Sequence, residues 1–262
     1  MRMRNTKVVG IMSARTLPAT FLFAFLCLRC FGGSADSVGI RFARFGKISV
    51  YKSKGTACSV IIFAAGDRGW NRRTVSMMKS IRSPGEVYVG INTRQYLNNM
   101  EKEKNECLYA AGDFQALSDY VKRKLQIREN APTILLGYSA GADLVYGTLC
   151  QAPPGVFKGA IVIGFCPDLA VRIPFCKGSG KFDMIPWTKK NGYNFGPCTN
   201  LAEPFISLQG MKDGVCNYQA TQSFLEEVQS AKLVKLPHTG HMYFIYKRWV
   251  PYMKEELKRL KS

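Results

Sequence analysis

The sequence predicts an α/β protein with a mostly parallel β-sheet covered by helices on both faces. Short apolar runs, typical of strands buried on both faces, alternate with longer segments whose apolar residues recur every three or four positions. A glycine-rich turn joins one of these runs directly to a helical segment. The chain has 262 residues, of which 47% are hydrophobic, and this composition suits one large folded domain rather than a disordered chain.

The first 35 residues have the features of an export signal. Basic residues precede an apolar stretch from Leu17 to Leu28, and small residues follow, so we predict cleavage after Ala35. The stretch is short for a transmembrane helix. An uncleaved anchor and initiation at Met12 are the alternatives. We expect residues 36–262 to form a single domain, because no repeat or linker-like segment divides them.

The chain is strongly basic, with a net charge of +19. Removal of the predicted signal takes away five basic residues and no acidic ones, which leaves +14. An exported protein with this charge is expected to be drawn to anionic lipid or cell-wall polymer. No nucleic-acid-binding motif accompanies the charge, so we expect no nucleic-acid partner.

Seven cysteines follow the predicted signal, and an oxidising compartment favours pairing of some of them. The odd number leaves at least one thiol free. We predict a Cys166–Cys216 bridge, because these residues follow two predicted strands, and a Cys176–Cys198 bridge, because these residues bracket a loop-like segment. The cysteine spacings do not suggest a zinc site, and we predict no metal and no cofactor.

In the first half of the chain we predict strands at 48–51, 60–64 and 87–91 and helices at 74–81 and about 104–126. The first two strands are joined around a turn at 53–55, and a glycine-bearing loop follows the second. The long helix is supported by apolar residues four, three, four and four positions apart, which lie on one face: Ala110, Phe114, Leu117, Val121 and Leu125.

The second half continues the alternation. Its predicted strands lie at 134–136, 159–163, 205–208 and 232–236, and its helices run to about 149, over 219–228 and at the end of the chain. Pro251 is expected to kink or split the last helix. Residues 164–200 are rich in Gly, Pro, Lys and aromatic residues and have little periodicity. Such a loop-rich insertion is either a lid over a site or a disulfide-pinned surface excursion.

The turn Gly137-Tyr138-Ser139-Ala140-Gly141 matches the G-x-S-x-G nucleophile elbow, and it lies between a strand and a helix as that motif requires. A sharp turn there would expose the Ser139 hydroxyl at the carboxyl edge of the sheet, in front of the positive end of the helix. Side chains at positions 137 and 141 would collide with the flanking chain. The simpler alternative is a glycine-rich turn without catalytic function.

Three predicted strand ends carry Ser139, Asp213 and His241 in the chain order expected of an α/β-hydrolase fold. We predict that His241 removes the proton of Ser139 and that Asp213 orients the imidazole. His238 is the alternative base, since the chain has only two histidines. Asp143, in the helix after the serine, is expected to support the elbow rather than to bear the catalytic charge.

An oxyanion formed at Ser139 needs preorganised hydrogen-bond donors. The backbone amide of Ala140 is one candidate, because it directly follows the serine. The second candidate is an amide in the loop after the 60–64 strand, for which we choose that of Asp67. We therefore predict a serine hydrolase acting on a carboxylic ester.

The segments that carry these residues resemble one bacterial family. The similarity covers about residues 58–250 and rests on the loop from Gly66 to Trp70, the segment from Gly90 to Tyr96, the run from Gly137 to Asp143, the turn with Asp213 and Cys216, and Gly240-His241. These features are similar to the VirJ/AcvB virulence-protein family. The resemblance implies an α/β-hydrolase fold, a periplasmic location and a link to virulence and type IV secretion.

AcvB-type members hydrolyse aminoacylated phosphatidylglycerol, so the resemblance implies an anionic phospholipid or membrane surface as substrate, of the lysyl-phosphatidylglycerol type. The resemblance also implies secretion-system proteins as partners. The alternative function is a non-catalytic periplasmic accessory protein that binds secreted proteins for a type IV secretion system, because a fold does not fix its function.

Overall fold

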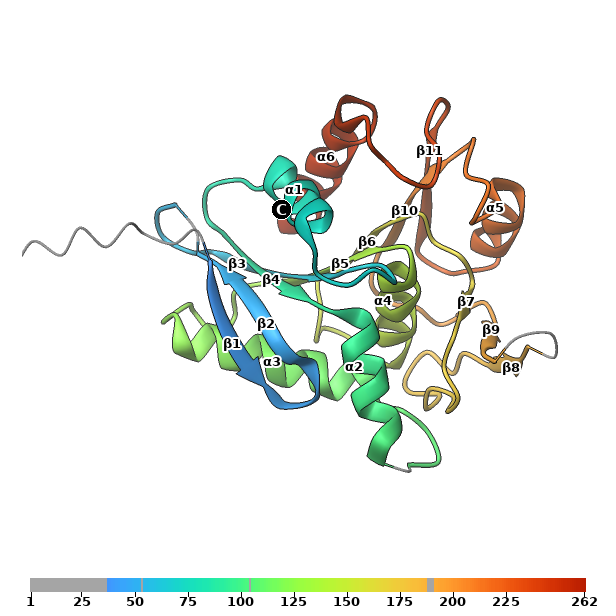
Figure 1. Cartoon of the computed structure of the whole chain (residues 1–262), viewed down its shortest axis with the longest axis horizontal. Coiled ribbons are helices and arrows are strands. Elements are labelled where there is room, and N and C mark those ends of the chain that lie inside the picture. Colours follow the sequence, from blue (N-terminus) through green and yellow to red (C-terminus); the bar gives the residue numbers. More distant parts are fainter. Residues whose placement is uncertain (1–36, 53, 104, 188–190) are drawn as a thin grey trace, which may run out of the picture. The chain divides into compact units, whose positions relative to one another are not determined.

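The computed structural model describes residues 37–52, 54–103, 105–187 and 191–262 (Figure 1). The predicted signal peptide and its cleavage site lie outside these residues. Within the described part of the chain, no helix has the length and apolar character needed to cross a membrane.

The core of the fold is one eight-stranded sheet with the strand order β1-β2-β4-β3-β5-β6-β10-β11. The strands β4 to β11 in this order are parallel neighbours, whereas β2 pairs antiparallel with both β1 and β4. The predicted mostly parallel sheet is confirmed. The strands are β1 Val38–Phe42, β2 Gly46–Tyr51, β3 Ser59–Ala64, β4 Glu86–Ile91, β5 Thr133–Tyr138, β6 Gly159–Ile163, β10 Phe205–Gly210 and β11 Ala231–Leu236.

The central strands are buried along their whole length and mostly apolar, because helices cover both faces of the sheet (Figure 1). Successive residues point to opposite sides, so in β3 the side chains of Ile61 and Phe63 join one core while Val60 and Ile62 join the other. The first core is closed by α1 Arg72–Ile81 and α6 Val250–Lys261, and the second by α2 Thr93–Met100, α3 Ala110–Lys124, α4 Ala140–Gln151 and α5 Tyr218–Glu226.

Several elements differ from the sequence-based expectation. β1 and α2 were not predicted: β1 is mostly exposed, and α2 is an eight-residue helix capped by the side chain of Asn92. β2 and β3 are consecutive in the chain but are not neighbours, because β4 pairs between them. Pro251 does not kink α6, because the helix begins at Val250. The amides of the first turn have no acceptor within the helix, so a proline there removes no intrahelical hydrogen bond.

The described residues of the insertion at 164–200 form more regular structure than their sequence indicates. It contains a small antiparallel sheet of β7 Asp168–Leu169, β9 Tyr193–Phe195 and β8 Met184–Pro186, in that order. This segment packs against α4, where the Tyr146 hydroxyl donates to the Gly196 carbonyl at 3.1 Å and accepts from the Cys198 amide at 2.9 Å. These contacts favour a pinned surface segment over a lid.

One of the two predicted disulfides is confirmed and the other is wrong. Cys166 is bonded to Cys216, but Cys176 is bonded to Cys107 and not to Cys198. The chain beside Cys107 runs along the insertion, with the Leu108 amide donating to the Pro174 carbonyl at 2.8 Å. The same contact explains why α3 begins at Ala110 and not near residue 104. Among the described residues, Cys58, Cys150 and Cys198 are free.

Candidate active site

The turn after β5 has the geometry of a nucleophile elbow. Ser139 has φ 53° and ψ −131°, a backbone conformation that is strained for any residue with a side chain. A Cβ atom at Gly137 would lie 2.5 Å from the Ala142 Cα, and one at Gly141 would lie 2.1 Å from the Ala64 carbonyl oxygen. Only glycine therefore fits at these two positions, as the sequence predicted.

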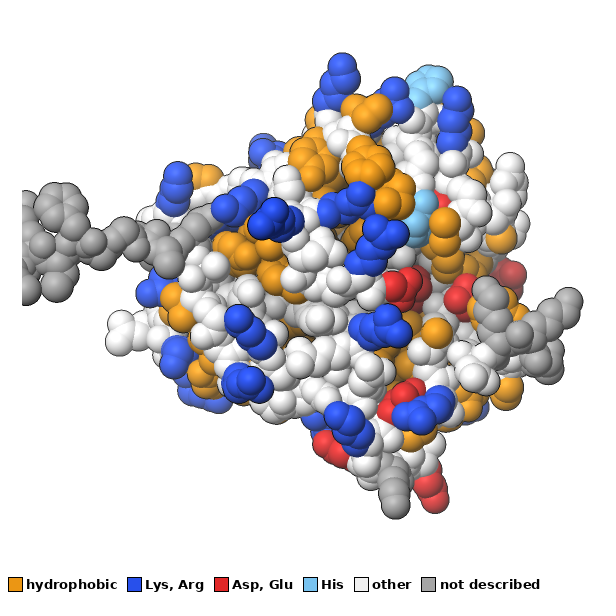
Figure 2. Space-filling model, viewed as in Figure 1, with side chains coloured by type: hydrophobic (Ala, Val, Ile, Leu, Met, Phe, Trp, Pro, Cys, Tyr) orange, Lys and Arg blue, Asp and Glu red, His pale blue; other side chains and the backbone are white. Residues whose placement is uncertain are grey.

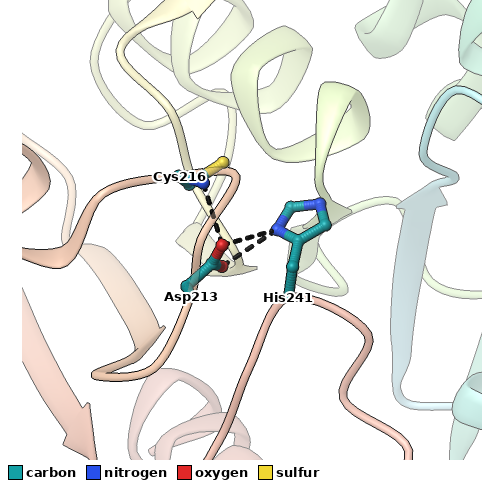
Figure 3. Close-up of side chains that lie close together, drawn as sticks. All are labelled: Asp213, Cys216 and His241. Atoms are coloured by element: carbon teal, nitrogen blue, oxygen red, sulfur yellow. Dashed lines mark hydrogen bonds and ion pairs between the residues drawn. The ribbon is translucent and has the colours of Figure 1, made fainter.

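The three side chains predicted to act together form one hydrogen-bonded row. The Ser139 Oγ lies 3.0 Å from the His241 Nε2. On the other side of the ring, the His241 Nδ1 lies 2.9 Å from the Asp213 Oδ2 and 3.1 Å from its Oδ1 (Figure 3). The Asp213 side chain is fully buried, and that of His241 is 12% exposed. The structure thus brings together residues separated by up to 102 positions in the chain.

The loop that carries Asp213 is fixed from several directions. Its Oδ1 accepts hydrogen bonds from the Val215 and Cys216 amides at 2.9 and 2.8 Å. The Cys166–Cys216 disulfide ties the same loop to the end of β6. The two amide donors hold the Asp213 carboxyl group in place beside the His241 Nδ1, where it can accept a hydrogen bond from the imidazole.

The loop that carries His241 is held by tyrosine hydroxyls. Tyr138 donates to the His241 carbonyl at 3.0 Å. Tyr243 donates to the Leu208 carbonyl and accepts from the Gly210 amide, both at 3.0 Å, which anchors the loop to β10. His238 is exposed and lies three residues before this anchored segment. His241, and not the alternative His238, contacts Ser139.

Asp143 does not belong to the hydrogen-bonded row. Its Oδ1 accepts from the Cys166 amide at 3.0 Å, so it links α4 to the chain after β6. Burial, and next the negative charge of Asp168, raise the pKa of the Asp143 carboxyl well above its usual value. The supporting role expected from the sequence matches this position.

We predict that Asp143→Asn makes the protein more stable at neutral and alkaline pH. A carboxyl whose pKa is raised by folding stabilises the protein fully below its unfolded pKa of about 4, and that stability is lost as the pH rises. Asparagine keeps an acceptor for the Cys166 amide but does not ionise. Urea unfolding should show the variant gaining about 1 kcal/mol or more on the wild type between pH 4 and pH 8. The exposed Asp183→Asn serves as control, and parallel pH profiles for Asp143→Asn and the wild type would contradict the prediction.

Both predicted oxyanion donors lie beside the serine. Ala140 is the first residue of α4, so its amide has no acceptor within the helix. The loop after β3 passes directly over the elbow, where a Cβ at Gly66 would lie 3.1 Å from the Ser139 Cβ. Asp67 follows in this loop and lines the hollow in front of Ser139. Both residues thus lie near Ser139, and the oxyanion role of their amides stays a prediction.

A hollow of about 290 Å³ opens in front of Ser139 and His241. It is lined from the loop after β3, from α1 and from the loops after β10 and β11. The two arginines among its lining residues, Arg68 and Arg73, outnumber the one acidic residue, Asp67. Arg73 also approaches the Met242 sulfur, at 3.7 Å. The charged side chains that line the hollow are thus more basic than acidic.

Asp213, Cys216 and His241 also have ligand atoms within 4.8 Å of one another, close enough for a metal ion (Figure 3). The donor set does not fit one. The Cys216 sulfur is bonded to Cys166 and offers no thiolate. The Asp213 carboxylate and the His241 Nδ1 already form a hydrogen bond with each other, so neither is free to bind a metal ion.

Sequence reasoning missed residues that shape the site without reacting. Gly164 has φ 64°, a backbone conformation that favours glycine, and it lies beside the imidazole, since a Cβ there would be in ordinary contact with the His241 Nδ1 at 3.4 Å. Arg73 lines the hollow. The position of Gly164 directly after a predicted strand was a usable signal, because parallel strands end at the ligand-binding edge. No local pattern marked Arg73.

The architecture is an α/β-hydrolase fold, and solved structures support this. Est1E from Butyrivibrio proteoclasticus is similar with a TM-score of 0.57 and 14% identity, over 86% of this chain and 99% of that one. The esterase EaEST from Exiguobacterium antarcticum has a TM-score of 0.55, 14% identity and the same coverage. A dienelactone hydrolase from Anabaena variabilis has a TM-score of 0.51 and 11% identity, over 86% of this chain and 97% of that one.

The sequence resemblance is also confirmed over part of the chain. Residues 58–160 match the family described as bacterial virulence protein (VirJ). The matched segment begins one residue before β3 and ends in β6. It includes the loop over the elbow, the elbow itself and α4. A comparison with curated proteins found no significant match.

Proposed function

We propose that the protein is an exported serine hydrolase that cleaves a carboxylic ester. The observation that carries this proposal is the row Ser139–His241–Asp213, with 3.0 Å between the serine oxygen and the His241 Nε2. A serine hydroxyl is a poor nucleophile unless a base removes its proton during attack. The imidazole is placed to do so, and the buried carboxylate stabilises the imidazolium that results.

The reaction follows from this placement. The Ser139 Oγ attacks the ester carbonyl as its proton passes to the His241 Nε2, and the Ala140 and Asp67 amides stabilise the oxyanion. The tetrahedral intermediate expels the alcohol, which takes the proton from His241. Water then attacks the acyl-serine in the same manner and releases the carboxylic acid, which restores the free hydroxyl.

The proposed substrate is the aminoacyl ester of an anionic phospholipid, of the lysyl-phosphatidylglycerol type. The basic lining by Arg68 and Arg73 supports an ester that carries a phosphate. The net charge of +14 that remains after removal of the predicted signal supports action at an anionic surface. A periplasmic location and a link to virulence and type IV secretion, with secretion-system proteins as partners, belong to the same proposal and rest on the family resemblance.

The proposal is tested by labelling the purified protein with a fluorophosphonate probe and locating the adduct by mass spectrometry. We expect one adduct, on Ser139, in folded protein and none after denaturation. The unlabelled protein should release lysine from lysyl-phosphatidylglycerol in mixed micelles, and the labelled protein should not. Folded protein that takes no label and releases no lysine would instead favour the non-catalytic accessory function.

A further inference from the structure

Large apolar side chains are exposed around the opening of the active site. Met211 and Val215 flank Asp213 in the loop after β10, and Phe244 and Ile245 follow His241 in the loop after β11. Their exposed fractions are 45, 68, 64 and 42%, respectively. Exposed apolar groups gathered at one place mark an interaction surface more often than singly scattered ones do.

Basic side chains lie among these apolar groups. The Arg73 guanidinium lies over the Phe244 ring at 4.1 Å from its centroid. Arg68 lines the hollow at Ser139 together with Val215, and Arg248 lines an adjoining hollow together with Ile245. Figure 2 shows hydrophobic and basic side chains on this face around one of the two histidines. We call Met211, Val215, Phe244, Ile245, Arg68, Arg73 and Arg248 the docking face.

We propose that the docking face binds the surface of an anionic lipid bilayer. Apolar side chains at the tips of loops can enter the boundary between headgroups and acyl chains, while neighbouring arginines remain at the level of the phosphates. Each basic residue near an anionic surface adds to the attraction. The chemistry of the face therefore matches a lipid surface better than an uncharged apolar partner.

This inference rests on the proposed function for its biological meaning and adds the orientation of the enzyme on its substrate. The loops that would enter the bilayer are the loops that hold Asp213 and His241. The opening at Ser139 would then face the lipid headgroups, so an ester there could reach the serine without leaving the membrane completely.

The test measures binding separately from catalysis. The Ser139→Ala protein, purified after export and removal of its signal, is mixed with vesicles of phosphatidylcholine, or of equal parts phosphatidylcholine and phosphatidylglycerol, and the bound fraction is measured by flotation. We expect binding to the phosphatidylglycerol vesicles that weakens as salt is raised. Adding Phe244→Ser and Ile245→Ser should weaken binding by about tenfold or more, because two exposed apolar side chains are lost. Val38→Ser with Ile185→Ser, which removes two exposed apolar side chains elsewhere, is the matched control.

Three results would overturn the docking face: no binding to anionic vesicles, equal loss of binding in the control, or a dimer in solution that Phe244→Ser and Ile245→Ser convert to a monomer. The outcome is independent of the proposed catalysis. A protein that binds vesicles through this face but takes no fluorophosphonate label retains the docking face and loses the hydrolase assignment. A protein that takes the label but fails to bind vesicles retains the hydrolase assignment and loses the docking face.

Discussion

Ser139→Ala should lower kcat/KM for a short acyl ester by about 10⁵-fold. The substitution removes the only atom that the row of side chains activates, since the His241 Nε2 has the serine Oγ 3.0 Å away as its partner. The residual rate should remain above that in water, because the oxyanion donors and the hollow are retained. Initial rates on p-nitrophenyl butyrate, compared at equal protein concentration, provide the measurement.

The control for this variant is Ser207→Ala, which removes a buried serine hydroxyl from β10. The Ser207 Oγ has no hydrogen-bond partner among the described residues, so its loss should leave kcat/KM within about threefold and the fold intact. Thermal unfolding should show both variants folded, and because alanine keeps the Cβ of serine, the backbone strain at the elbow is unchanged and the stability of Ser139→Ala should stay close to that of the wild type. A Ser139→Ala enzyme that keeps most of its activity would exclude the serine as nucleophile.

The catalytic row could be predicted because each of its members is marked locally. Ser139 lies in a strand–turn–helix pattern with glycines at fixed positions, and the chain has only two histidines, both after the last strand. Asp213 follows from chain order and from the rule that parallel strands end at one edge. The strand–helix alternation was predictable for a similar reason, since strands buried on both faces are continuous apolar runs.

The features that were missed depend on contacts between distant segments. The Cys107–Cys176 bridge joins residues 69 positions apart, and no spacing distinguishes it from the predicted Cys176–Cys198 pair. β1 and α2 are short and half-polar, so tertiary packing rather than periodicity determines them. The exposed position of Phe244 and Ile245 was likewise hidden, because an apolar residue in a loop has the same appearance in a sequence whether it is buried or exposed.

Asp213→Asn should lower kcat by about 10⁴-fold without unfolding the protein. Asparagine has the size of aspartate, but its amide group can donate a hydrogen bond to the His241 Nδ1. The imidazole would then carry its proton on Nε2, which faces Ser139, and could not act as a base. The neutral side chain would also no longer stabilise the imidazolium that forms during attack. The pH dependence of kcat should show the loss at every pH at which the wild type is active.

Asp143→Asn is the matched control, because it makes the same change at a second buried aspartate near the elbow. Asp143 bonds the Cys166 amide and not the imidazole, so its variant should keep kcat within about tenfold of the wild type. Equal losses of kcat in the two variants would indicate that activity depends on a buried carboxyl group near the elbow in general, and not on the hydrogen bond between Asp213 and His241. A small loss in Asp213→Asn alone would show that His241 needs no acceptor at Nδ1, and the row would then consist of the serine and the histidine only.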